Sequence, residues 1–144
     1  MKNADTSVAM NPTVNVDILI VRDSHVLLGM PSDKWLQGKE KLWGIPGDDI
    51  QFEETIEEAV RRNLRDELGV TLKSMKILGV HENFAFGNHY IGIGILVDID
   101  GEPDLKPISD NWQTWEWFSF DQLPENLFIA AQKTIGEYQT MKRD

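Results

Sequence analysis

Apolar and polar residues alternate in several segments of the chain, which is the pattern of half-buried β-strands. The first of these segments runs from Val14 to Ile20, and a turn at Asp23 and Ser24 leads into an apolar partner at 26–29. Later strands are predicted at three further segments, which are 75–81, 89–99 and 115–118. The chain is therefore expected to form an early hairpin and at least three more strands.

One strongly helical segment separates the early strands from the later ones. It is predicted to run from about Thr55 to Leu68, with Gly69 as its C-cap. At ~100° per residue its apolar side chains share one sector, and these are Ile56, Ala59, Val60, Leu64 and Leu68. Asn63 and Glu67 fall in the same sector. A carboxylate in line with a core-facing stripe is costly unless a cation or a hydrogen-bond donor meets it.

A second helix is predicted near the C-terminus. Asn126 is expected to cap it. Its apolar face would carry Leu127, Phe128, Ala131, Ile135 and Tyr138. Several strands around one early helix, with another helix at the end, indicate a mixed α/β fold.

Two other parts of the chain are polar and lack periodicity. Residues 1–13 are expected to form a flexible N-terminal tail. The segment 31–42 carries Lys34, Lys39 and Lys41 and shows no helix or strand signal, so it is expected to be a surface loop with local positive charge.

Length and composition narrow the class of protein. A chain of 144 residues, 41% of them hydrophobic, is enough for one core and too short for two ordinary domains, so 14–144 is expected to be a single domain. The chain has neither a leader-like N-terminal run nor an apolar stretch of about 18 residues, and we therefore expect a soluble, cytoplasmic protein without membrane contact. The absence of cysteine excludes disulfides, a thiolate zinc site and a cysteine nucleophile.

The charge balance disfavours long nucleic acids as partners. The chain has 14 Lys and Arg against 24 Asp and Glu, a formal charge of −10 that repels a phosphate backbone. A small anionic substrate would need a local cation, either a basic patch or a metal ion.

The end of the predicted helix offers such a metal site. Asn63, Asp66 and Glu67 stand at i, i+3 and i+4, so three oxygen-bearing side chains lie together. Two carboxylates on one turn, with a backbone carbonyl and waters, suit Mg²⁺, which prefers oxygen ligands in octahedral geometry. The alternative is a solvated helix end whose charges pair with each other.

The order of residues from Pro46 to Val70, PGDDIQFEETIEEAVRRNLRDELGV, resembles the Nudix box, G-x5-E-x7-R-E-U-x-E-E-x-G-U with U aliphatic. The positions that agree are Glu54, Arg62, Leu64, Glu67, Gly69 and Val70, and Asp66 replaces a glutamate while keeping the carboxylate. Two positions depart, since Asp48 replaces the opening glycine and Asn63 replaces the glutamate after the arginine. Gly47, the first of the usual glycine pair, is retained.

This resemblance implies a Nudix-type α/β/α sandwich with a mixed central sheet. It further implies Mg²⁺-dependent hydrolysis, with Mn²⁺ as an alternative ion, of the diphosphate linkage of a small nucleotide such as an ordinary or oxidised nucleoside triphosphate. By analogy, Glu67, Asp66 and the carbonyl of Gly47 would hold the metal. Glu54 would stand beside the metal or hold Arg62, whose guanidinium fork fits a carboxylate.

Asn63 is the residue that leaves the catalytic role open, because an amide neither carries charge nor accepts a proton at neutral pH. Slower chemistry, a base from elsewhere, or a domain that binds without turnover would each explain it. Replacement bases to consider are Glu82, Asp110 and His81.

Two alternatives to a triphosphate hydrolase follow from these departures. GDP-mannose hydrolases of the same superfamily also lack this glutamate and look similar around QFEET, but they use a histidine base from a later loop. The corresponding loop here, ISDNWQTWEW, offers Asn111 and Trp112 instead. A catalytically weak Nudix domain that binds a nucleotide is the second alternative.

Substrate contacts are predicted outside the box as well. Trp112 is a candidate for stacking on a nucleobase, and Lys34 for binding a distal phosphate. The long apolar strand from His89 is compatible with a homodimer.

Overall fold

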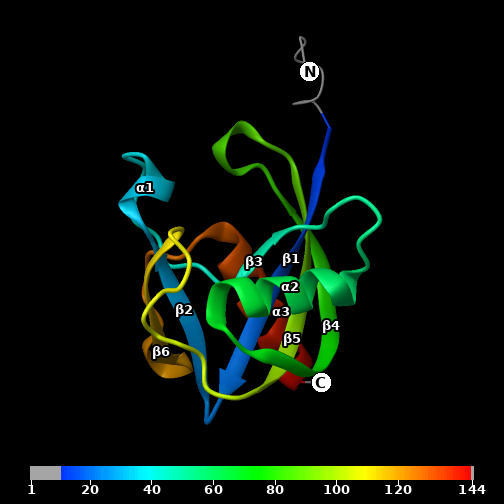
Figure 1. Cartoon of the computed structure of the whole chain (residues 1–144), viewed down its shortest axis with the longest axis vertical. Helices are drawn as coiled ribbons and strands as arrows, with labels where there is room; N and C mark the ends of the chain where they lie inside the picture. Colours follow the sequence, from blue (N-terminus) through cyan, green and yellow to red (C-terminus); the bar gives the residue numbers. More distant parts are fainter. Residues whose placement is uncertain (1–10, 144) are drawn as a thin grey trace.

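Residues 11–143, which the computed structural model describes, fold around a mixed sheet of six strands (Figure 1). The strands are β1 (Thr13–Arg22), β2 (His25–Pro31), β3 (Gly47–Asp49), β4 (Thr71–Asn83), β5 (Tyr90–Asp100) and β6 (Trp112–Ser119). Their order is β4-β5-β1-β2-β6, with β3 paired to β1 outside this path. Only β1 and β5 run parallel among the pairs of this sheet, and the predicted mixed sheet is confirmed.

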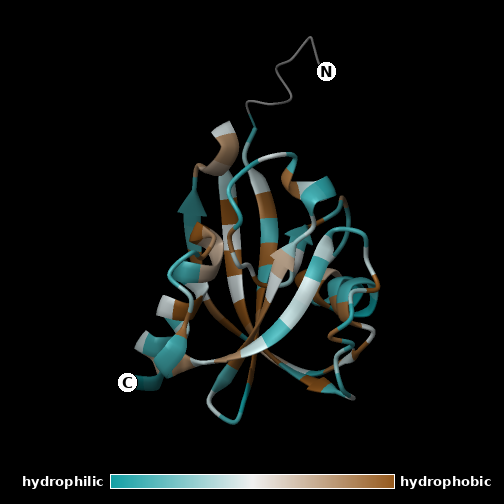
Figure 2. Cartoon of the chain, turned by 90° about the vertical axis from the view of Figure 1, so that its left-hand side faces the viewer, coloured by the Kyte–Doolittle hydropathy of each residue, from teal (hydrophilic) through white to brown (hydrophobic). Residues whose placement is uncertain are grey.

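Two helices cover opposite faces of the sheet. In Figure 1, α2 (Ile56–Leu68) lies in front of the strands and α3 (Ile129–Arg143) lies behind them. Hydrophobic residues alternate with other residues along the central strands (Figure 2). The sheet is therefore the middle layer of an α/β/α sandwich, as the sequence predicts.

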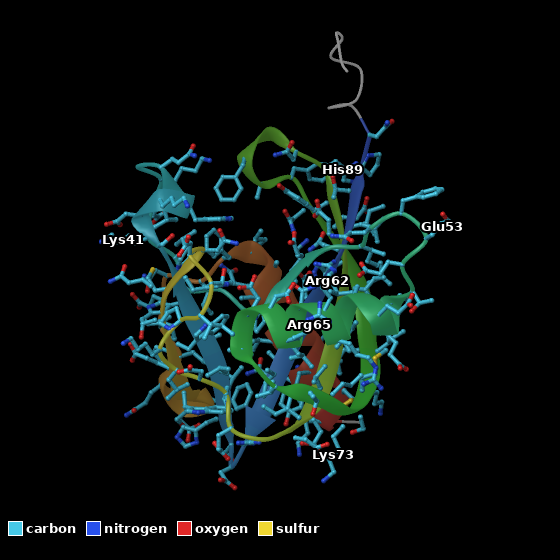
Figure 3. The ribbon with its side chains drawn as sticks, in the orientation of Figure 1. Lys41, Glu53, Arg62, Arg65, Lys73 and His89 are labelled. Atoms are coloured by element: carbon cyan, nitrogen blue, oxygen red, sulfur yellow. The ribbon has the colours of Figure 1, made fainter. Side chains whose placement is uncertain are left out.

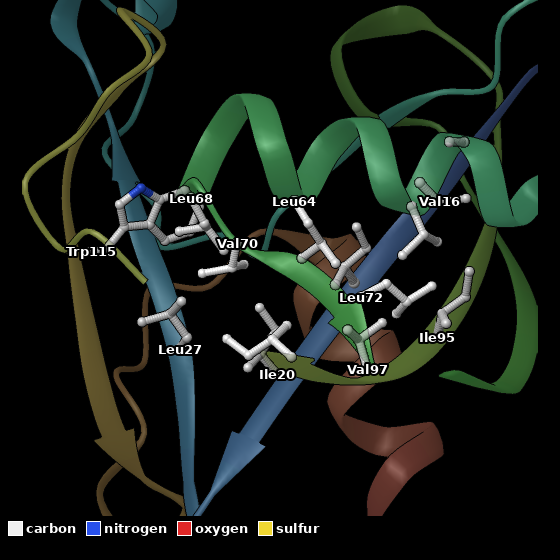
Figure 4. Close-up of a cluster of buried hydrophobic side chains, with 14 residues drawn as sticks. Val16, Ile20, Leu27, Leu64, Leu68, Val70, Leu72, Ile95, Val97 and Trp115 are labelled. Atoms are coloured by element: carbon white, nitrogen blue, oxygen red, sulfur yellow. The ribbon is translucent and has the colours of Figure 1, made fainter. Parts of the chain in front are cut away.

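Strand β1 supplies side chains to both layers because successive residues of a strand point to opposite faces. Val16, Ile18 and Ile20 pack beneath α2, in the cluster that Figure 4 shows around Leu64 and Leu68. Leu19 belongs instead to the cluster under α3, with Ala131 and Ile135. Each fully buried aliphatic side chain of this kind stabilises the fold by roughly 1.5–3 kcal/mol.

The ends of α2 are fixed by local hydrogen bonds. The Thr55 hydroxyl accepts from the Glu58 backbone N–H, and the Glu58 carboxylate accepts from the Thr55 N–H, which makes a capping box. Gly69 ends the helix in the left-handed region with φ 68°. The predicted apolar face and C-cap are both confirmed.

The hairpin between β1 and β2 also forms as expected. Asp23 and Ser24 make its two-residue turn with φ values of 49° and 61°, the conformation that twists in the same sense as the strands. The strand itself begins at Thr13, within the segment that was predicted to be a tail. Residues 1–10 of that predicted tail lie outside the described residues.

Two expectations about local structure are wrong. The predicted loop at 31–42 contains the short helix α1 (Asp33–Leu36), which begins because the Ser32 hydroxyl accepts from the Trp35 N–H. Asn126 does not cap α3. Its amide donates to the Lys41 carbonyl at 3.0 Å, and the helix begins only at Ile129.

Short 3₁₀ turns complete the structure at Ala85–Gly87 (η2) and Phe120–Gln122 (η3). Within residues 11–143, no helix is long and apolar enough to cross a membrane.

Candidate active site

A cavity of about 400 Å³ opens at the end of the sheet where β1 begins, and it is large enough for a small organic ligand. Its walls include the aromatic rings of Trp35, Phe86, Trp112 and Phe128. Its polar lining includes Asn15, Asp17, Asp48, Asp49, Glu67 and Asn83. The cavity is therefore acidic at one end and bordered by flat apolar surfaces that could enclose a ring.

Glu67 is a buried carboxylate of this cavity. It lies in the last turn of α2, only 9% exposed, and its Oε2 is buried without a hydrogen-bond partner among the described residues. Burial raises the pKa of Glu67, and the charges of Asp48 and Asp66 add to this effect, while the nearby donors of Ser109 and Trp112 oppose it. A buried acid that is short of donors and surrounded by like charge is stabilised best by a cation.

Gly47 brings the loop before α2 close to this carboxylate. Its φ is +152°, and a Cβ there would collide with the backbone carbonyl of Val16. Glycine therefore lets β3 approach β1 closely. As a result Asp48, the residue after Gly47, lines the same cavity as Glu67.

Glu54 and Arg62 fix the same loop from the other side. The guanidinium of Arg62, which Figure 3 labels on α2, donates to Glu54 through Nε at 2.7 Å and Nη2 at 2.9 Å. Its Nη2 also donates to the Asp49 carbonyl. This pair, with the Gln51 N–H, lowers the pKa of Glu54 to about 2. Neither side chain lines the cavity, so the geometry favours the holding role over direct contact with a metal.

A family model for the NUDIX domain matches residues 11–138 of this chain. The chain belongs to the Nudix hydrolase family. The predicted family and fold class are thus confirmed.

Named Nudix proteins match over much of the same length. An ADP-ribose pyrophosphatase of Methanocaldococcus jannaschii is 30% identical over 135 residues, which cover 92% of this chain and 76% of the relative. An oxidized purine nucleoside triphosphate hydrolase of Danio rerio is 34% identical over 119 residues, or 74% of this chain and 66% of that protein. A crystal structure of a MutT NUDIX hydrolase from Burkholderia pseudomallei is 29% identical with a TM-score of 0.78, and the match covers 88% of this chain and 98% of that one.

The structure separates the two carboxylates of the Nudix box. Glu67 lines the cavity, whereas Asp66 is exposed and its Oδ1 accepts from Arg65 Nε at 3.0 Å. A solvated helix end therefore describes Asp66 but not Glu67. Asp48 was not predicted as a site residue, although its place next to Gly47 in the motif is the signal that could have identified it.

Asn63 is turned into the helix rather than toward a substrate. It is 2% exposed, and its Nδ2 donates to the Ala59 carbonyl at 2.8 Å, one turn earlier. It does not line the cavity. The side chain that departs most from the family pattern is thus accounted for by a local hydrogen bond.

The remaining predicted residues divide between the cavity and the surface. Trp112 lines the cavity and packs on Trp115 with ring centroids 4.3 Å apart. Lys34 lies outside it, 3.6 Å from exposed Asp110, although its neighbour Trp35 is part of the wall. Glu82 pairs with His89 at 2.9 Å and also lies outside the cavity.

The donor set suits a hard cation that keeps part of its water shell. Within residues 11–143, no group of three or more His, Cys, Asp or Glu side chains is arranged to hold a metal by itself. Mg²⁺ commonly binds through one or two carboxylates and completes its octahedron with waters and substrate phosphates. The orphaned oxygen of Glu67, with Asp48 and the Gly47 backbone beside it, fits that mode.

The raised pKa of Glu67 predicts how stability depends on pH. Without divalent cations, the folded state holds the Glu67 proton more tightly than the unfolded chain does. The contribution of Glu67 to the free energy of unfolding should therefore fall as pH rises from about 4.5 through the raised pKa. Urea unfolding of wild type and Glu67→Gln at a series of pH values should show the two free energies of unfolding separating within that window, with the variant more stable above it. A difference in free energy of unfolding that does not change with pH would contradict the assignment. Mg²⁺ should stabilise only the wild type.

Proposed function

We propose that this Nudix hydrolase cleaves the diphosphate linkage of a small nucleotide derivative with a divalent cation, Mg²⁺ or in its place Mn²⁺. The observation that carries the proposal is the buried, partnerless oxygen of Glu67 in an acidic cavity with aromatic walls. An anionic substrate enters such a cavity only with a cation that offsets the carboxylates.

The relatives support the same bond as the target. Their names describe an ADP-ribose pyrophosphatase, an oxidized purine nucleoside triphosphate hydrolase and an NAD-capped RNA hydrolase. Substrates of all three kinds contain an anhydride between phosphates joined to a nucleoside. A base between the aromatic walls, with the phosphates toward Glu67, would fill the cavity from one end to the other.

In this proposal Glu67 and the Gly47 carbonyl hold the cation, and Asp66 adds negative charge from the solvent side. When bound, such a cation neutralises the diphosphate and promotes attack by water. The Glu54–Arg62 pair keeps the Asp49 carbonyl, and with it the loop from Gly47, in place. Trp112 offers its ring as part of the nucleoside wall.

Asp48 supplies the carboxylate that the box lacks at Asn63. One position of the pattern loses a glutamate, and another, normally glycine, gains an aspartate that faces the same cavity. The two changes leave the number of carboxylates in the motif unaltered. This exchange favours an active enzyme over the binding-only alternative.

Location in the cytoplasm and assembly as a homodimer stay predictions from the sequence. A nucleotide-sugar hydrolase remains the second candidate, favoured by the missing glutamate at Asn63 and the QFEET segment.

Single-turnover assays with Mg²⁺ test the proposed function directly. The panel consists of ADP-ribose, a purine nucleoside triphosphate, its oxidised form and GDP-mannose. At least one should be cleaved between phosphates, and Glu67→Gln should lower the rate by about 100-fold or more, because a cation contributes several kcal/mol to such steps. Glu57→Gln is the matched control, since Glu57 pairs with Arg61 on the exposed face of the same helix. Tight binding without products would refute the hydrolase, and free sugar would favour the second candidate.

The exchange between Asp48 and Asn63 has its own test. Asp48→Gly alone should reduce kcat strongly, because it removes a cavity carboxylate without replacing it. Adding Asn63→Glu to that variant restores the family residues at both of these positions and should recover activity. If Asp48→Gly is as active as wild type, or the double variant stays inactive while folded, the exchange is wrong.

A further inference from the structure

A chain of largely buried polar side chains runs from the cavity floor on β1 to α3. Asn15 Nδ2 donates to Asp17 Oδ1 at 2.9 Å, and His81 Nε2 lies 2.8 Å from Asp17 Oδ2. The other ring nitrogen of His81, Nδ1, lies 3.0 Å from Glu137 Oε2. The side chains of His81 and Asp17 are only 6% and 7% exposed. Three elements, β1, β4 and α3, thus meet through one imidazole.

Glycines in the sheet make the space for this cluster. A Cβ at Gly92 would collide with Asp17 and His81, and a Cβ at Gly94 would collide with Glu137. At Gly79 a Cβ would lie 2.8 Å from Glu137 Oε2. Burying ionisable groups is expensive compared with apolar packing, so a cluster that displaces apolar side chains is a candidate for a role beyond stability.

The geometry favours a protonated His81. Both ring nitrogens face carboxylate oxygens, and both can donate only in the imidazolium form. Burial alone would lower the pKa of His81, but the hydrogen bonds and charges of Asp17 and Glu137 outweigh it and raise the pKa above its usual value. From β5, Gly92 lies against the ring, and Lys133 on α3 donates to the Glu82 carbonyl.

The cluster reaches the cavity through its β1 end. Asn15 and Asp17 line the cavity, while His81 and Glu137 do not. Because Asn15 turns its amide nitrogen to Asp17, its Oδ1 remains buried without a partner. The cavity floor, formed by Asn15 and Asp17, therefore offers fixed hydrogen-bond acceptors. The Asp17 carboxylate would add to the negative charge of Asp48 and Glu67 unless His81 offsets it.

We infer that His81 is a positioning residue for substrate binding, which holds Asp17 in one orientation on the cavity floor and offsets its charge without touching the substrate. The inference rests on the proposed function, since it concerns the same cavity. Glu137 acts through His81 and links this floor to α3, whose first residues also line the cavity.

The expected effect is on KM rather than kcat. As pH rises through the pKa of His81, the ring loses a proton, Asp17 loses its charged partner, and KM should rise while kcat stays unchanged. In His81→Gln, KM should be raised about tenfold at every pH, which is the difference between a charge-assisted and a neutral hydrogen bond. A residue that only stabilises the fold would not produce this pH profile.

The experiment combines steady-state kinetics with histidine NMR titration between about pH 6 and 9, a range that begins near the ordinary histidine pKa. The substrate is whichever of ADP-ribose, the purine triphosphates and GDP-mannose the wild type hydrolyses fastest. The chain has three histidines, which keeps the spectrum simple. Glu137→Gln removes one charge but keeps a hydrogen-bonding group, so it should move both the His81 titration and the rise in KM to lower pH. It also carries the test if His81→Gln does not fold.

His89→Gln is the matched control, because His89 pairs with Glu82 at the surface and lies outside the cavity. It should leave the KM profile unchanged. Two results would overturn the inference while leaving the hydrolase intact. One is a KM that still rises with pH in His81→Gln, and the other is a rise in KM that occurs at the wild-type pH in Glu137→Gln. If the wild type hydrolyses none of these nucleotides, the proposed function fails, and the inference fails with it.

Discussion

Pairing of β1 with three other strands is the interaction on which both the fold and the site depend. The strand runs antiparallel to β2 and β3 and parallel to β5, so it lies in the middle of the sheet. Its alternate side chains fill the core beneath α2 and beneath α3. The same pairing sets Gly47 opposite Asp17, and the loop that follows Gly47 therefore borders the cavity.

The metal-binding proposal follows from how α2 sits on this sheet. Its apolar stripe must face the core, and Glu67 belongs to that stripe. The carboxylate is thus buried for the same reason that Leu64 and Leu68 are buried. Burial without a hydrogen-bond partner makes Glu67 unfavourable for the stability of the fold but suits it to bind a cation. Functional sites commonly keep residues that reduce stability in this way.

Features set by local sequence were predicted correctly. The face of α2, its Gly69 cap and the turn at Asp23 and Ser24 each depend on residues within a few positions of one another. The four-residue helix α1 was missed because it is too short to show a periodic pattern, and its only signal is the Ser32 cap. Asn126 was misjudged because its amide bonds across the molecule to Lys41.

Features that depend on distant contacts could not be read from the sequence. His81 meets Asp17 and Glu137 only because β4, β1 and α3 come together, across 64 and 56 residues of chain. Asp48 looked like a simple departure from the family pattern until the fold placed it in the cavity with Glu67. From the sequence alone, Asn63 suggests a weakened catalytic site. In the structure its amide donates to the Ala59 carbonyl of the same helix.

Direct binding of Mn²⁺, measured from the electron paramagnetic resonance signal of the free ion, tests the central claim that Glu67 anchors a cation site. Wild-type protein at pH 7.5, a value chosen above about 4.5 where free glutamate is ionised, should bind Mn²⁺ measurably in the absence of nucleotide. Glu67→Gln should lose that binding, while Glu57→Gln should retain it. Equal binding of Mn²⁺ by wild type and Glu67→Gln would contradict the claim.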